Sequence, residues 1–175
     1  LPPGQRVIEG FPRFGTHLAR PTPGVPADPV ITIRGAVTGA FDVPLATLAT
    51  LPRRELIAHF HCVAGWSATN LRWEGVSFET FYRTIIEPAL VPGTEVTHVV
   101  FRGLDGYRSV VLIEDALMDG VLVAERLDGG PLGADHGAPG PPARALRDRG
   151  REPHGAPRAA RAPGARDRGV PRAYL

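Results

Sequence analysis

The amino-acid composition of the chain changes abruptly at Gly137. From this residue to the end, 31 of 39 residues are Ala, Arg, Pro or Gly, and apart from alanine only four are apolar. So few apolar side chains cannot bury enough surface to offset the entropy of ordering a chain. We therefore expect a low-complexity, disordered basic tail over residues 140–175 and a single folded domain before it.

The charge divides along the same boundary. Residues 1–136 have a net charge of −4, from 11 arginines and 15 acidic residues, whereas residues 137–175 carry +6. The first part has no basic stripe interleaved with aromatic residues, so nucleic acid is not an expected partner. All 20 basic residues are arginine, and the tail consists largely of residue types that G/C-only codons specify. We hypothesise that the tail is an out-of-frame translation of a GC-rich gene.

Cysteine content and hydropathy exclude further classes of protein. Cys62 is the only cysteine, which excludes an internal disulfide framework and a cysteine-rich zinc module. No apolar run approaches the roughly 18 residues that span a bilayer, so a soluble chain without a transmembrane segment is expected. The first residues lack a charged-then-apolar signal pattern, and this favours the cytoplasm.

The part before the tail shows strand and helix patterns in irregular order. The proline-rich residues 20–29 read as a connector, so we expect an extended N-terminal segment over 1–29 and a domain over 30–139. Strands are predicted at 30–34, 55–61, 95–102, 107–112 and 121–127, and helical stretches at 44–51, 77–86 and 113–118. Because strands and helices do not alternate strictly, the predicted class is α+β, a mixed β-sheet with short helices.

The segment with the most unusual chemistry is residues 59–67 (HFHCVAGWS), followed by residues 72–76 (RWEGV). Cys62 falls where the predicted strand ends and a glycine-containing turn begins, a position at which functional side chains are common. Both tryptophans of the chain lie within 11 positions of it. A lone cysteine is otherwise a small buried apolar residue, so its position and neighbours are what favour a functional role.

Zinc binding through His59, His61 and Cys62 is an alternative that these residues leave open. Alternate residues of a strand share a face, so only the two histidines would point together, and no fourth ligand is spaced to join them. Separately, Arg72 and Glu74 could form a rim ion pair with little energetic weight.

Three stretches together carry a longer and ordered pattern. They are HCVAGWS at 61–67, LRWEGVSFETFYR at 71–83, and a later pair at 97–117 (THVVFRGLDGYRSVVLIEDAL) and 121–139 (VLVAERLDGGPLGADHGAP). This pattern resembles the molybdopterin-binding domain of the sulfite oxidase family, over about residues 10–139.

The resemblance implies a molybdenum–molybdopterin cofactor whose metal takes one protein ligand, the thiolate of Cys62. A soft thiolate suits such a metal, and a single protein ligand leaves positions open for substrate. The implied reaction is two-electron oxygen-atom transfer on a small oxyanion or a sulfoxide-type substrate. The implied electron partner is a separate haem protein.

The same resemblance makes His17 and His136 candidate cofactor contacts, and Arg108 the first candidate for substrate contact. Where the family continues from the loop of His136 into an arginine and a further strand, this chain has Pro141 and the tail. Loss of that segment is expected to impair cofactor binding. The alternative is a non-catalytic remnant or binding domain, without cofactor, whose Arg-rich tail associates with acidic partners.

Overall fold

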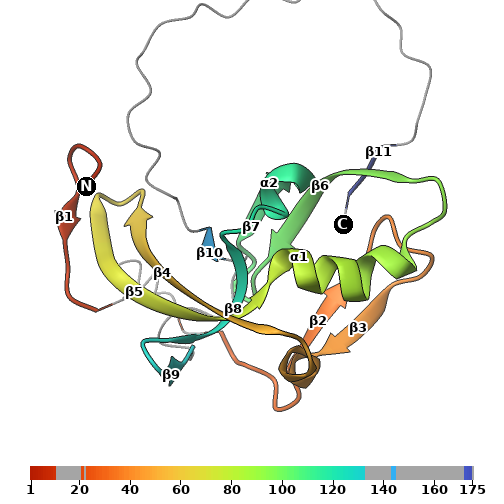
Figure 1. Ribbon diagram of the computed structural model, residues 1–175, viewed down its shortest axis with the longest axis horizontal. Helices are drawn as coiled ribbons and strands as arrows, with labels where there is room; N and C mark the ends of the chain where they lie inside the picture. The colour runs from red at the N-terminus through yellow and green to blue at the C-terminus, as the bar shows by residue number, and fades with distance from the viewer. Residues whose placement is uncertain (11–20, 22, 133–142, 145–171, 175) are drawn as a thin grey trace, which may run out of the picture.

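The computed structural model describes residues 1–10, 21, 23–132, 143–144 and 172–174. These residues form an α+β fold built on a six-stranded mixed sheet, which confirms the predicted class (Figure 1). The sheet runs in the order β1-β5-β8-β10, with β4 also paired to β5 and β9 to β8. Its strands are β1 (Arg6–Val7), β4 (Arg53–Cys62), β5 (Trp66–Ser77), β8 (Val121–Leu127), β9 (Gly130–Pro131) and β10 (Ala143–Arg144).

Strands β4 and β5 form a long antiparallel ribbon that ends in the turn after Cys62. The sequence predicted β4 but not β5, although β5 is the longest strand described. A bulge explains the omission, because the pairing shifts between Ala58 and Phe60 and places one extra β5 residue there. Asn70 takes a left-handed backbone conformation at this point, with φ of 57°. The bulge breaks the two-residue alternation by which strands are recognised.

Gly75 brings β5 and β8 unusually close together. The register between these strands shifts between Glu74 and Gly75. A Cβ atom on Gly75 would lie 2.1 Å from the carbonyl oxygen of Val123, well inside van der Waals contact. The glycine of the RWEGV segment is therefore required by the approach of the neighbouring backbone.

Two smaller sheets and a set of short helices complete the described fold. The smaller sheets are β2 (Val30–Ile33) with β3 (Phe41–Pro44), and β11 (Arg172–Tyr174) with β6 (Glu95–Arg102) and β7 (Arg108–Leu112). The helical segments are η2 (Leu45–Thr50), α1 (Phe78–Phe81), η3 (Tyr82–Ile86), η4 (Glu87–Ala89) and α2 (Ile113–Ala116). In the part of the chain that the structure describes, no helix has the length and apolar character to cross a membrane.

Apolar side chains gather into two clusters. The larger one joins the helical stretch 78–89 to the smaller sheets, and in it the ring of Phe78 meets Phe101 edge-on at 5.2 Å between centroids. The second cluster lies on one face of the β4–β5–β8 sheet, and its buried members are Ala68, Leu71, Trp73, Leu122 and Leu127. This second cluster supports the ribbon whose end carries Cys62.

The segment expected to be a low-complexity tail contributes two short described strands. β10 pairs antiparallel with β8, and β11 pairs parallel with β6. The rest of residues 140–175 lies outside the described residues.

Candidate functional site

Cys62 is the last residue of β4, at the end of the ribbon, as the sequence predicted. It pairs across the turn with Trp66, and its carbonyl oxygen accepts a hydrogen bond of 3.1 Å from the amide of Gly65. Gly65 has φ of 83°, a conformation that favours glycine and closes the turn tightly. Val63, the next residue after the cysteine, is 99% exposed, whereas Cys62 is buried at 6% exposure. The turn thus places the buried Cys62 directly beside a solvent-exposed residue.

The side chain of Cys62 belongs to the apolar face of the ribbon by strand alternation. Phe60, two residues earlier, packs on the second cluster and lies 5.5 Å from the ring of Trp66. His59 and His61 alternate to the opposite face. The zinc alternative is therefore wrong for these residues, because no three His, Cys, Asp or Glu side chains gather into a metal-binding group in the described ranges.

A chain of hydrogen bonds lies on the other face of the ribbon. The Nδ1 atom of His61 is 2.7 Å from the hydroxyl oxygen of Ser67, which is fully buried. That hydroxyl donates to Oε1 of Gln5 over 3.0 Å, and Nε2 of Gln5 donates to the carbonyl oxygen of Cys62 over 3.0 Å. From the sequence, Ser67 was included in the segment 59–67 but was assigned no role, and Gln5 was not singled out.

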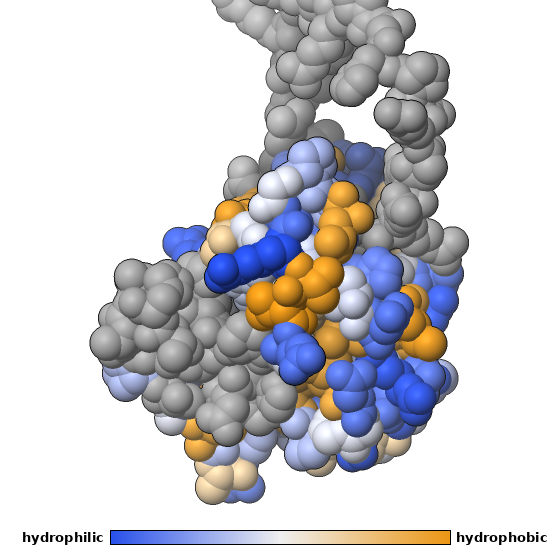
Figure 2. All heavy atoms as spheres, turned by 90° about the vertical axis from the view of Figure 1, so that its left-hand side faces the viewer, coloured by the Kyte–Doolittle hydropathy of each residue, from blue (hydrophilic) through white to orange (hydrophobic). Residues whose placement is uncertain are grey.

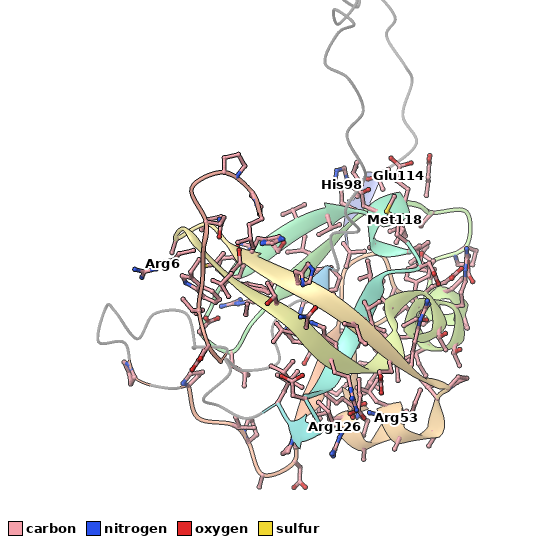
Figure 3. The ribbon with its side chains drawn as sticks, turned by 60° about the vertical axis from the view of Figure 1, so that its left-hand side comes forward. Arg6, Arg53, His98, Glu114, Met118 and Arg126 are labelled. Carbon is pink, nitrogen blue, oxygen red and sulfur yellow. The ribbon has the colours of Figure 1, made fainter. Side chains whose placement is uncertain are left out.

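The strand β1 brings Gln5 to this position. β1 pairs parallel with the first residues of β5, and backbone bonds join the amide of Arg6 to Gly65 and the amide of Ile8 to Ser67. Figure 1 shows β1 beside the turned end of the ribbon. Figure 3 shows Arg6 at this end, pointing away from the ribbon, and Arg53 and Arg126 near its opposite end. Residues 5–8 are therefore part of the surroundings of Cys62.

Three further charged or polar side chains of the ribbon, those of His59, Arg72 and Glu74, have structural partners. His59 accepts a hydrogen bond from the amide of Asn70 through Nδ1, at the bulge. The expected ion pair between Arg72 and Glu74 is not formed, because both side chains alternate to the same face of β5 and meet neighbouring strands. Their partners are Glu55 for Arg72, at 3.6 Å, and Arg126 for Glu74, at 3.5 Å.

Arg108 lies on a different sheet from Cys62. It is the first residue of β7, and it pairs directly with Arg102 across β6 and β7. Both side chains are exposed, and neither forms an ion pair with another residue that the structure describes. Two like charges on directly opposed positions disfavour strand pairing, and a guanidinium group is suited to binding an anion.

His17 and His136, the two candidate cofactor contacts, lie outside the described residues. In Figure 2, which views the molecule from the left-hand side of Figure 1, apolar side chains gather in a central band with hydrophilic side chains on either side of it.

The donor set around Cys62 fits a metal group that needs a single protein thiolate. Cys62 supplies one soft donor on an ordered turn, and no other cysteine exists in the chain to compete for it. A site made from several protein ligands would require a cluster that the described residues do not contain.

Comparisons with known proteins show the family to which the chain belongs. The family model of the oxidoreductase molybdopterin-binding domain matches residues 19–142, and the chain belongs to this family. The resemblance to the sulfite oxidase type of this domain is thereby confirmed. As a family member, the chain is a molybdopterin-binding oxidoreductase domain.

Two relatives illustrate the family. The uncharacterized oxidoreductase YuiH of Bacillus subtilis is 28% identical over 144 residues, which are 79% of this chain and 67% of that protein. The crystal structure of the sulfane dehydrogenase SoxCD from Paracoccus pantotrophus superposes with a TM-score of 0.52 at 18% identity. That likeness shows the fold, and it covers 66% of this chain and 33% of the SoxCD chain. The present chain thus corresponds to about a third of that longer chain.

Proposed function

We propose that the chain binds a molybdenum–molybdopterin cofactor through the thiolate of Cys62 and acts as an oxidoreductase of the sulfite oxidase type. The observation that carries the proposal is the position of this one cysteine, buried on a turn that hydrogen bonds fix from two sides. When bound, the cofactor supplies two-electron redox chemistry coupled to oxygen-atom transfer. A separate haem protein is the proposed electron partner.

The chain's own residues have distinct tasks in this proposal. Cys62 holds the metal, and the apolar face beside it, with Phe60 and Trp66, limits the access of water. His17 and His136 contact the pterin. Arg108 contacts a small oxyanion or sulfoxide-type substrate, because its planar guanidinium offers several donors to such a group and lacks an acidic partner among the described residues. The segment that replaces the family's continuation after His136 is expected to weaken cofactor binding.

The variant Cys62→Ser tests the assignment of the metal ligand. The chain and its variant are expressed in a host that makes the cofactor, and metal content, pterin content and turnover with a reduced dye and a sulfoxide are measured. We expect molybdenum and turnover to be lost while the melting temperature stays close to that of the unchanged chain, since the two side chains are similar in volume. Ala64→Ser places the same hydroxyl on an exposed position of the same turn and is expected to retain both. Full retention of molybdenum and turnover in Cys62→Ser would overturn the proposal.

A further inference from the structure

The hydrogen bonds behind Cys62 have a defined direction. The amide of Gln5 must present Nε2 to the carbonyl of Cys62, because a carbonyl only accepts. Its Oε1 then faces Ser67 and accepts the single hydroxyl proton of that residue. The oxygen of Ser67 can take part in the bond to His61 only as an acceptor, so Nδ1 of His61 carries a proton. Donation therefore runs in one sense, from His61 through Ser67 and Gln5 to the backbone of Cys62.

Burial raises the free-energy cost of breaking this series of hydrogen bonds. Ser67 is fully buried, and a buried hydroxyl without partners loses the free energy of its hydration. Both lone pairs of the Cys62 carbonyl are also used, one by Gly65 and one by Gln5. These two hydrogen bonds restrict the rotation of the peptide group that follows Cys62. They thereby restrict the direction of the Cα–Cβ bond of Cys62.

Apolar burial explains little of the position of β1, the strand that directly follows Gln5. Its two residues, Arg6 and Val7, are both exposed, so burial of apolar surface does not hold β1 in place. Among the residues that the structure describes, the backbone bonds to Gly65 and Ser67 and the side chain of Gln5 hold it there. Gln5 and Cys62 are 57 residues apart in sequence, so the contact specifically joins the N-terminal segment to the turn.

We propose that Gln5 is a positioning residue for Cys62. By donating to the carbonyl of the turn, with Ser67 and His61 fixing its own orientation, it holds the thiol in the direction from which it binds its metal. The role in metal binding rests on the proposed function of Cys62, whereas the restraint on the turn does not. Preorganised ligands of this kind are supported by neighbouring hydrogen bonds in metal sites generally.

Two substitutions separate the bonds that Gln5 makes. Gln5→Leu removes both side-chain hydrogen bonds at similar volume. Gln5→Glu keeps an acceptor for the Ser67 hydroxyl but has no N–H for the Cys62 carbonyl. If the restraint acts through that carbonyl, the two variants should behave alike. Arg6→Gln changes the next residue, which is exposed, and is the matched control.

The first readout is the rate at which a thiol reagent modifies the full chain prepared without cofactor. Because Cys62 is the only cysteine, the reaction reports on this residue alone. Both Gln5 variants are expected to react about fivefold faster than the unchanged chain, the effect of losing roughly one net hydrogen bond. Arg6→Gln is expected to react at the original rate. Melting temperatures of all variants show whether global unfolding contributes.

The second readout is the half-time of molybdenum release from the loaded chain, which both Gln5 variants should shorten. Unchanged thiol reactivity in both variants would overturn the proposal, and so would an unchanged rate in Gln5→Glu beside a faster one in Gln5→Leu. If the variants react faster but Cys62→Ser fully retains molybdenum and turnover, the proposed function fails and the restraint on the turn stands.

Discussion

At the scale of single residues, positions in the ribbon differ in how far their role could be read from the sequence. Cys62 was placed correctly at a strand end, because a β-branched and aromatic run followed by a glycine turn is a local signal. Gln5 gave no such signal. Its contact depends on the parallel pairing of a two-residue strand with a partner far along the chain, and local patterns do not encode such pairing.

Gly75 is a position at which one added methyl group should be damaging. Gly75→Ala is expected to lower the free energy of unfolding by about 3 kcal/mol, at the upper end of the cost of overpacking, because the added Cβ meets the backbone carbonyl of Val123. Urea unfolding measures this change. Gly39→Ala is the control, because nothing lies within 4 Å of the added atom and the change should stay within about 1 kcal/mol. Equal stability of the two variants would contradict the close approach of β5 and β8.

Tyr82 should make the fold sensitive to alkaline pH. Burial raises the pKa of its hydroxyl above the usual value, the negative charge of Glu87 raises it further, and Arg83 lowers it. The folded state therefore holds this proton more tightly than the unfolded chain, and the resulting stability is complete below the unfolded pKa and is lost as pH rises through the folded one. Urea unfolding from about pH 9 to about pH 11 should show a steeper loss for the unchanged chain than for Tyr82→Phe.

Tyr107→Phe is the control for this pH dependence, since Tyr107 is 59% exposed. Its stability should follow that of the unchanged chain across the alkaline range. Parallel curves for the unchanged chain and Tyr82→Phe would show that the Tyr82 hydroxyl does not contribute.

At the scale of elements, the sequence predicted five of the eleven described strands, β2, β4, β6, β7 and β8, and most of the helical segments. The signals were local ones, such as Ser77 before an apolar helical pattern and the Asp105–Gly106 turn between β6 and β7. β5 was missed because its bulge at Asn70 interrupts the alternation of apolar residues. Pairing across the sheet, and not local propensity, keeps this strand extended.

Ser77 is expected to stabilise the helical stretch that follows β5. Its hydroxyl oxygen accepts a hydrogen bond of 3.0 Å from the amide of Thr80, which would otherwise lack a partner in the first turn. Ser77→Ala should cost about 1 kcal/mol in thermal or urea unfolding. Ser77→Asp restores an acceptor at this position and should recover most of the loss. An aspartate variant as unstable as the alanine variant would show that the cap is not what Ser77 contributes.

At the scale of the whole molecule, the change in composition at Gly137 and the end of the family match fall in the same part of the chain. The match to the molybdopterin-binding domain ends at residue 142, within the stretch where Ala, Arg, Pro and Gly begin to dominate. If the tail results from a shifted frame, another frame of the same gene downstream of codon 140 should encode a continuation of the family pattern, with an arginine soon after the His136 loop. Translation of the three frames checks this. The absence of such a continuation in every frame would refute the frameshift hypothesis.

The frameshift hypothesis also predicts how the family's continuation would affect cofactor binding. Fusing that continuation to residues 1–139 should increase the amount of molybdenum retained per chain, because the added arginine and loop would contact the anionic end of the pterin. Equal retention with either C-terminal segment would show that this segment does not contribute to cofactor binding.

The most direct test of the central claim is X-ray absorption at the molybdenum edge, on the unchanged chain and on Cys62→Ser, both produced in a host that makes the cofactor. We predict that the metal in the unchanged chain has one more sulfur neighbour than any metal retained by the variant, the difference being the thiolate of Cys62. An identical sulfur shell in the two proteins would contradict the assignment of Cys62 as the metal ligand.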